Sequence, residues 1–483
     1  MIQTSIIEIN CTNEKELQEM YINLENNGNL FVIVHNDIND ENVFNVIKKI
    51  LKLGYFFINN IICIKENEEN KHFQINNSYY NLVWFSKKQN QNKFYKDNIR
   101  EKHIWKDVEW GKREKNYNPK GKDPGNVWIP TEDNGRAIIT NHIILTIEEV
   151  INRILESTTD EEDEVYVKIK TLFNKEKIVK NRRLKIEKCN IEQTQNKIIL
   201  KEKKKQNLES LNKNFIKKAE VYFKTSENMS EIKNEEIDLV VTSPPYWDLK
   251  NYFKDGQIGQ ESYEKYLERL SKVWKECYRV LKNDGNIFIN INTRTKNSKP
   301  ILIPGDIIYE CEKIGFSLKD IIIWHKSSGI PTSAKNLTDK YEYVLWFIKK
   351  DEREIPIEEI MNIKDYKNDK LNYGNIWNIN RKAGSAGKDY IHPAIYPTKL
   401  VERIVKLLTN EGDIVLDPFL GSGTSLIGAI NLNRNFKGYE YNKDFYDLIN
   451  YRTNKEVNKI DFELKFENLE KNNSLQIYRK KDN

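Results

Sequence analysis

Cysteine and long apolar runs are scarce in this 483-residue chain. The cysteines show neither a CxxC pattern nor a Cys/His spacing, so the sequence predicts neither a disulfide framework nor a zinc site and favours a reducing, cytoplasmic setting. No apolar run approaches the roughly 18 residues that span a bilayer, and no charged-then-apolar leader opens the chain, so we expect no membrane partner. The five cysteines are Cys11, Cys63, Cys189, Cys277 and Cys311.

Charge is modest overall but unevenly placed. The formal net charge is +6, and the hydrophobic fraction of 39% together with the length allows two or three folded domains. Residues 165–219 carry a strong excess of Lys and Arg over Glu, just after the acidic run "TTDEEDEV". Two interpretations of this basic stretch stay open: a solvated connector, or a strip that contacts nucleic-acid phosphates.

The first third of the chain repeats patterns of the second half. "YYNLVWFSKK" from Tyr79 resembles "YEYVLWFIKK" from Tyr341, and "GNVWIP" from Gly125 resembles "GNIWNI" from Gly374. Five such blocks occur in the same order at near-constant spacing, which predicts a degenerate internal duplication. The first copy lacks counterparts of "TSPPYW" and "DPFLGSGTS", so we expect it to have no site of its own.

A glycine-rich turn stands in "GDIVLDPFLGSGTSLIGAI". Asp417 ends a short apolar strand, and Gly421 and Gly423 permit a tight turn with backbone exposed to a ligand before a helix begins near Thr424. Glu440 follows the next strand, where its carboxylate is placed to accept both hydroxyls of a ribose. The lysine of a phosphate-binding loop is absent after the last glycine, which argues against a nucleoside triphosphate.

The segment "TSPPYW" sets two prolines and two aromatic residues directly after an apolar strand. Together with "DPFLGSGT", it resembles the S-adenosylmethionine-dependent amino-methyltransferases of DNA, which methylate an exocyclic base nitrogen. The motif order, with "HPAIYP" just before the glycine motif, resembles the β arrangement of that family. The likeness covers about residues 221–450 and implies a Rossmann-like, doubly wound α/β sheet, S-adenosyl-L-methionine as cofactor and double-stranded DNA as partner.

The resemblance also implies roles for individual residues. The tetrapeptide would accept the hydrogens of the amino group and stack on a base flipped out of the duplex, and Trp247 would add a wall to that pocket. The tetrapeptide residues are Ser243, Pro244, Pro245 and Tyr246. The expected cofactor-binding residues are Asp417 (methionine amino group), Phe419, Gly421, Gly423, Thr424, Glu440 (ribose), and His392, Pro393, Tyr396 and Pro397 (methionine carboxylate).

The likeness also sets the expected domain organisation. A target-recognition segment is expected at about residues 351–389, where Arg381, Lys382 and Lys388 would contact phosphates or guanine edges. The sequence departs from the family pattern at Lys224 and Thr225, where a Gly-Asp pair is usual, so the adenine-side contact stays open. The predicted parts are a degenerate lobe without a cofactor site (1–157), a basic connector (158–219), a catalytic domain (220–457) and a tail (458–483).

Several alternatives stay open for the function. Serine at the first position of the tetrapeptide favours cytosine N4 as the target, with adenine N6 as the alternative. Methylation of RNA or protein and a non-catalytic DNA-binding subunit are the rival classes. A restriction endonuclease is a candidate partner, and the decayed first copy is a candidate built-in second subunit of a monomeric enzyme.

Overall fold

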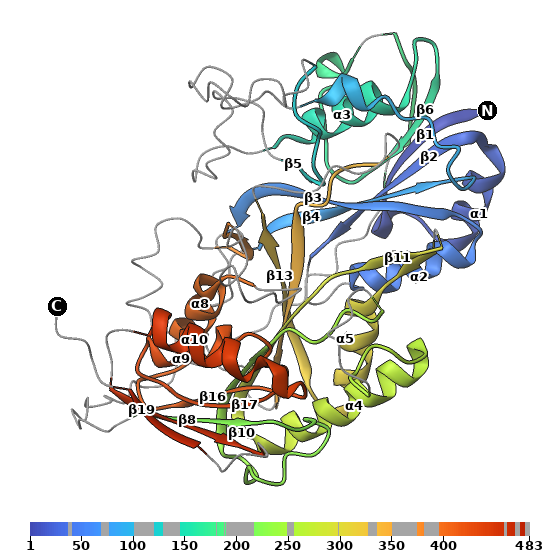
Figure 1. Cartoon of the computed structure of the whole chain (residues 1–483). Helices are drawn as coiled ribbons and strands as arrows, with labels where there is room; N and C mark the ends of the chain where they lie inside the picture. Colours follow the sequence, from blue (N-terminus) through green and yellow to red (C-terminus); the bar gives the residue numbers. More distant parts are fainter. Residues whose placement is uncertain are drawn as a thin grey trace, which may run out of the picture.

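The computed structural model describes most of the chain as two α/β lobes (Figure 1). We call residues 1–187 the first lobe and residues 217–478 the second lobe. No helix in the part described is long and apolar enough to cross a bilayer. The described residues are 1–36, 41–68, 77–100, 120–128, 145–179, 181–187, 189, 217–248, 256–297, 299–326, 336–349, 374–380, 396–457, 461–468 and 474–478.

A seven-stranded sheet forms the first lobe, in the order β5-β3-β4-β2-β1-β6-β7. Its strands are β1 (Ile2–Glu8), β2 (Leu24–His35), β3 (Phe56–Glu68), β4 (Asn77–Ser86), β5 (Val127–Trp128), β6 (Glu164–Lys168) and β7 (Arg183–Ile186). Its α-helices are α1 (Glu14–Asn23), α2 (Val43–Lys52) and α3 (Ile147–Thr158). A capping box begins α3, because Thr146 and Glu149 each accept from the other's backbone N–H.

A ten-stranded sheet forms the second lobe, in the order β15-β13-β14-β10-β9-β16-β17-β8-β18-β19. Its strands are β8 (Lys217–Tyr222), β9 (Ile237–Thr242), β10 (Leu281–Ile291), β13 (Ser317–His325), β14 (Tyr341–Ile348), β15 (Ile376–Asn378), β16 (Ile414–Asp417), β17 (Asn435–Tyr439), β18 (Phe462–Glu467) and β19 (Ser474–Tyr478). Its helices are α4 (Tyr263–Val280), α5 (Ile303–Ile314), α8 (Thr398–Leu408), α9 (Thr424–Ile430) and α10 (Tyr446–Glu456). A small hairpin, β11 (Arg294–Lys296) and β12 (Lys299–Ile301), follows β10.

Helices cover both faces of the second sheet, as the predicted doubly wound fold requires. Apolar side chains of α4 and α5 pack on one face in a core that continues into the first lobe. Side chains of α8, α9 and α10 pack on the other face. Strands buried on both sides are accordingly rich in Ile, Val, Leu and Phe, as β10 and β14 show.

The two sheets share one topology, which confirms the predicted degenerate duplication in the first lobe. The order β5-β3-β4-β2-β1-β6-β7 corresponds strand by strand to β15-β13-β14-β10-β9-β16-β17. Every neighbouring pair also has the same parallel or antiparallel sense in both sheets. The equivalent helices α2 and α5 are both followed by glycines with positive φ, Gly54 (95°) and Gly315 (117°).

Packing pairs in the cores are kept as well. Trp84 donates its indole N–H to Asn29 Oδ1 over 2.8 Å, and Trp346 donates to Asn286 Oδ1 over 2.9 Å. These residues occupy equivalent register positions on β4 and β2 and on β14 and β10. Thus the duplication extends to individual structural side chains.

The lobes meet through equivalent elements with reciprocal contacts. The Tyr79 hydroxyl donates to the carbonyl oxygen of Ile321 (2.5 Å), and the Tyr341 hydroxyl donates to that of Asn60 (2.9 Å). In the two registers Tyr79 corresponds to Tyr341, and Asn60 corresponds to Ile321. Such exchange of equivalent partners is the mark of an isologous, two-fold interface, here formed within one chain.

The predicted connector and tail boundaries are wrong. Strands β6 and β7 belong to the first sheet, so the first lobe extends at least to Ile186 instead of ending at residue 157. The basic charges of β7 belong to an edge strand, with Arg183 and Lys185 exposed, which is a common protection of sheet edges. Likewise β18 and β19, in the predicted tail, extend the second sheet beside β8.

The cysteine prediction is also wrong at one pair. Cys11 and Cys189 form a disulfide in the structure, although 178 residues separate them in the sequence. The parallel sheet brings the end of β1 near the residues that follow β7, and this proximity leaves no trace in the cysteine spacing. Cys63, Cys277 and Cys311 are buried free thiols.

Candidate active site

The Ser-Pro-Pro-Tyr tetrapeptide follows β9, which lies in the second sheet between β10 and β16. Ser243 is the first residue past the strand, and proline cannot donate to a sheet ladder, so the backbone leaves the sheet at this point. The Tyr266 hydroxyl on α4 donates to the carbonyl oxygen of Pro245 over 2.7 Å and fixes the loop from one side.

A polar cluster from neighbouring strands holds Tyr246. Its hydroxyl donates to Glu342 Oε2 over 2.6 Å, and Asn290 Nδ2 lies 3.0 Å from the hydroxyl oxygen and 2.9 Å from the same carboxylate oxygen. Lys326 donates to the other oxygen of Glu342 over 2.9 Å. Burial raises the pKa of Glu342, but the Lys326 charge and these hydrogen bonds outweigh it, so the pKa is lowered and the carboxylate stays ionised. Sequence reasoning missed this cluster because its members are far apart in the sequence: Tyr246 follows β9, Asn290 lies in β10, Lys326 follows β13 and Glu342 lies in β14.

Trp247 differs from the predicted wall of a base pocket. The residue is only 9% exposed, and its indole N–H donates to the carbonyl oxygen of Glu261 over 2.8 Å. Tyr263 packs edge-on against the ring, and Lys296 Nζ lies 4.3 Å from the ring centroid. The indole therefore supports the loop from inside.

Asp417 ends β16 and is fully buried. Its Oδ1 accepts from the Thr242 hydroxyl (2.6 Å) and the Phe419 backbone N–H (2.9 Å), while its Oδ2 accepts from the hydroxyls of Ser425 (2.5 Å) and Tyr396 (3.3 Å). Burial raises the pKa of this carboxyl, and the hydrogen bonds oppose that shift. Four chain donors thus fill its acceptor positions, and the long Tyr396 contact is the weakest of them.

The glycine turn has the backbone that its sequence requires. Gly421 and Gly423 have φ values of 55° and 81°, in the left-handed region that glycine adopts at little cost. Arg452, buried on α10, donates from Nη1 to the carbonyl oxygen of Ser422 (2.8 Å), its hydroxyl (2.7 Å) and the Thr424 hydroxyl (2.9 Å). Glu456 balances the Arg452 charge at 3.0 Å. Arg452 is 30 residues from Ser422 along the chain, so no local sequence pattern predicted that this helix clamps the turn.

Glu440 stands just after β17, against the same turn. Its Oε2 accepts from the Gly421 backbone N–H and its Oε1 from that of Asn442, both over 2.7 Å. Burial raises the pKa of Glu440 to about 8. Backbone N–H groups fill only part of the acceptor capacity of this carboxyl group, and the remainder suits a diol.

Several predicted residues are not among those that the structure describes. His392, Pro393, Arg381, Lys382 and Lys388 are outside the described residues. Of the predicted recognition segment, the structure describes only residues 374–380, and these include the sheet strand β15. At the departure from the family pattern, Lys224 pairs with Glu231 over 2.7 Å, and Thr225 bonds Glu227 over 3.0 Å.

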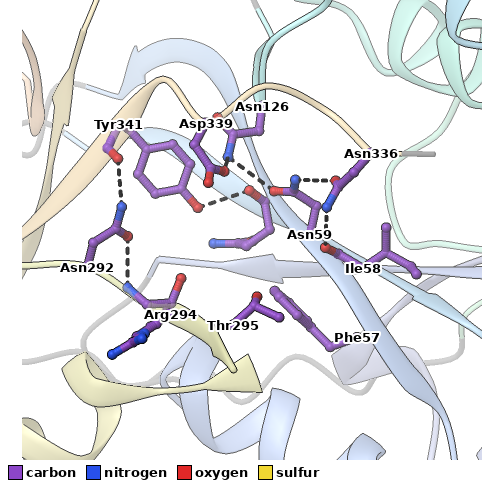
Figure 2. Close-up of a pocket in the computed structure, with 12 residues that line it drawn as sticks. Phe57, Ile58, Asn59, Asn126, Asn292, Arg294, Thr295, Asn336, Asp339 and Tyr341 are labelled. Atoms are coloured by element: carbon purple, nitrogen blue, oxygen red, sulfur yellow. Dashed lines mark hydrogen bonds between the residues drawn. The ribbon is translucent and has the colours of Figure 1, made fainter. Parts of the chain in front are cut away.

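A polar pocket lined by residues of both lobes lies between them (Figure 2). Asn292, just past β10, and Arg294, the first residue of β11, face Phe57 and Asn59 of the first lobe across it. Arg294 also donates to the backbone carbonyl of Trp247, so one wall of the pocket is tied to the "TSPPYW" loop. The sequence did not indicate this pocket.

Comparison with known proteins adds to this geometry. A family model described as DNA methylase matches residues 8–166 and 237–451, which fall in both lobes. The Type II methyltransferase M.BglII of Bacillus subtilis is 35% identical over 242 residues, covering 46% of this chain and 65% of that protein. The Type II methyltransferase M.MthZI of Methanothermobacter thermautotrophicus is 31% identical over 310 residues, covering 54% of this chain and 83% of that protein.

Solved structures with a similar arrangement cover about half of the chain. PvuII DNA methyltransferase, described as cytosine-N4-specific, covers 48% of this chain and 86% of its own at 23% identity, with a TM-score of 0.41. The M1.HpyAVI–SAM complex covers 48% of this chain and 98% of its own at 24% identity, with a TM-score of 0.34.

Proposed function

This chain belongs to the DNA methylase family, and from that premise we propose that it transfers a methyl group from S-adenosyl-L-methionine to the exocyclic N4 of cytosine in double-stranded DNA. The proposal rests on one observation, the close placement of the tetrapeptide and Asp417. Ser243 to Tyr246 leave β9 next to β16, whose last residue, Asp417, bonds Thr242 directly before the tetrapeptide. Base-side and cofactor-side motifs thus meet at the carboxyl ends of adjacent strands, where doubly wound sheets bind ligands.

The residues around the glycine turn fit the cofactor chemically. Glu440 offers the remaining acceptor capacity of its carboxyl group to a ribose diol, and the left-handed backbone at Gly421 and Gly423 allows close approach without a Cβ. Asp417 is a fully buried carboxylate that would attract the methionine ammonium, which would replace the long Tyr396 contact. When bound, S-adenosyl-L-methionine supplies an activated methyl group on a sulfonium sulfur.

The tetrapeptide supplies the other half of the reaction. An exocyclic amine conjugated to its ring is a poor nucleophile, so the protein must draw its nitrogen toward tetrahedral geometry. The Ser243 hydroxyl and the Pro244 carbonyl would accept the two amino hydrogens, and Tyr246 would stack on the flipped base and offset part of the cost of extruding it. Catalysis then rests mainly on positioning, because the methylated nitrogen becomes acidic and loses its proton readily.

The choice of cytosine as the target base is the more specific part of the proposal. Serine at the first tetrapeptide position supports cytosine N4, and methylation of adenine N6 would use the same residues. Purified protein should incorporate labelled methyl groups from the cofactor into unmethylated DNA, and digestion to nucleosides should yield N4-methylcytosine. N6-methyladenine would reverse the base assignment, and no labelled base at all would contradict the function.

We further propose that the first lobe serves as a built-in, catalytically silent second subunit. The face of the second lobe that carries Tyr341 is already covered by the equivalent face of the first lobe, which carries Tyr79. A second chain has no such face left, so we expect the mass of one chain in sedimentation at micromolar concentration. A stable dimer under these conditions would contradict the proposal.

The raised pKa of Glu440 predicts a pH effect on stability. The unfolded chain releases this proton near pH 4.5, while the folded protein holds it to about pH 8, so ionisation costs folding free energy progressively across that window. Without cofactor, Glu440→Gln should therefore gain stability relative to the wild type as pH rises from 5 to 8, with no further gain above 8. Thermal unfolding at several pH values measures this, and exposed Glu411→Gln is the control. A difference that stays constant with pH would contradict the expectation.

A further inference from the structure

The Glu342 cluster is a costly feature for a protein core. Lys326 is 2% exposed and Asn290 is 5% exposed, and both bond the Glu342 carboxylate. Burying an ion pair requires removing both charges from water, and well-packed apolar residues often stabilise a fold as much or more. A further cost comes from Asn290 Oδ1, which is buried without a hydrogen-bond partner among the described residues.

Orientation of the Asn290 amide is fixed by its neighbours. Its Nδ2 donates to Glu342 Oε2 and lies 3.5 Å from the Ser243 hydroxyl oxygen. A flipped amide would set Oδ1 against the carboxylate, so the unpaired acceptor follows from the charge beside it. The same charge fixes the Tyr246 hydroxyl.

The first lobe provides an internal comparison that separates fold from function. Phe31 opposite Trp84 and Phe288 opposite Trp346 align the two sheets residue by residue. Pairs that pack the fold are kept in both lobes, as with Asn29–Trp84 and Asn286–Trp346. The reaction-site positions are not kept: Ser243, Asn290, Glu342 and Asp417 correspond to Glu8, Ile33, Tyr80 and Val167.

The residues at the positions of Asn290 and Glu342 therefore differ between the two lobes, as do those at the positions of the tetrapeptide serine and the cofactor-side aspartate. Ile33 is buried at the position of Asn290, which shows that the same strand and register fold with an apolar residue there. Only a lysine persists, Lys65 at the place of Lys326. A structural role would predict the opposite pattern, retention in both lobes as for the Trp–Asn pairs.

We propose that Glu342 and Asn290 are positioning residues for methyl transfer, holding the Tyr246 ring and the Ser243 hydroxyl in register for the target amino group. This inference rests on the proposed function. The carboxylate fixes the tyrosine at its hydroxyl, so the ring can stack on a base only in one plane. Lys326 balances the negative charge of this Glu342 carboxylate.

Three variants test the proposal by different chemistry. Glu342→Gln removes the charge, Asn290→Ile introduces the residue that the first lobe tolerates, and Tyr246→Phe removes the hydroxyl while keeping the ring. The initial rate of labelled-methyl incorporation into unmethylated DNA at saturating cofactor should fall roughly 10- to 100-fold for Glu342→Gln and Asn290→Ile, the scale expected when reacting groups are misplaced. Cofactor affinity should stay within about twofold of wild type, because neither side chain bonds the glycine turn.

A double variant and a matched control sharpen the test. The double variant Glu342→Gln with Tyr246→Phe should be no slower than the slower single variant, because both substitutions weaken or remove the same hydrogen bond between the Tyr246 hydroxyl and the Glu342 carboxylate. Tyr80→Phe changes the position equivalent to Glu342 in the first lobe and should leave the rate within about twofold of wild type.

The outcomes separate the inference from the proposed function. Wild-type rates in Glu342→Gln and Asn290→Ile overturn the inference, and so does a rate loss matched by equal loss of cofactor binding and thermal stability, since that marks a structural role. Absence of methyl transfer by the wild type itself overturns the proposed function and the inference with it.

Discussion

Asp417→Val should abolish methyl transfer and weaken the fold at the same time. The substitution puts into β16 the residue found at the equivalent position of β6, Val167. It removes the carboxylate that we place at the cofactor ammonium, and it leaves the hydroxyls of Thr242 and Ser425 and the Phe419 N–H without their acceptor. Each unsatisfied buried donor costs about 1–3 kcal/mol, so we expect the free energy of unfolding to drop by about 3 kcal/mol or more.

Asp417→Asn separates the two effects. It keeps one carbonyl acceptor and nearly the same volume but removes the charge, so most of the stability should remain while cofactor binding falls. Calorimetry with S-adenosyl-L-methionine and urea unfolding of both variants measure the two quantities. Wild-type cofactor affinity in Asp417→Asn would remove Asp417 from the cofactor site.

Arg452→Met should be the most damaging change outside the reacting groups. The buried guanidinium bonds the Ser422 carbonyl and hydroxyl and the Thr424 hydroxyl, and its charge is paired with Glu456. Removing one partner of a buried pair typically costs about 3–5 kcal/mol, because the remaining groups lose their compensation. The glycine turn would lose its clamp, so cofactor affinity should fall as well.

Lys455→Met is the matched control, because it removes a cation from the exposed side of the same helix. Its effect on the free energy of unfolding should stay within about 0.5 kcal/mol, as for most surface substitutions. Chemical denaturation of both proteins gives the comparison. Equal stability of Arg452→Met and Lys455→Met would show that the turn does not depend on Arg452.

Local patterns in the sequence were enough for the fold class and for the position of the main motifs. Prolines after an apolar strand and glycines after an aspartate fix backbone direction over a few residues, and the structure has β9 and β16 side by side as those motifs require. The repeat was visible because apolar strands and glycine turns recur in the same order, and the shared strand order of the two sheets follows from it.

Contacts between distant segments could not be predicted in this way. The Glu342 cluster joins β10, β14 and the residue just past β13, the Arg452 clamp joins α10 to the glycine turn, and the disulfide joins Cys11 to Cys189. Each depends on which elements become neighbours, and no spacing along one segment encodes it. The alternating Arg and Lys of β7 led to the wrong prediction of a connector for a related reason, since an exposed edge strand and a solvated connector have similar composition.

The most direct test of the account is the base content of DNA from cells that otherwise lack base methylation and express this protein. Digestion to nucleosides and mass spectrometry should reveal N4-methylcytosine with the wild type and none with Asp417→Val, while Tyr80→Phe in the first lobe should leave the modification in place. Unmodified DNA from cells that contain folded wild-type protein would contradict the account.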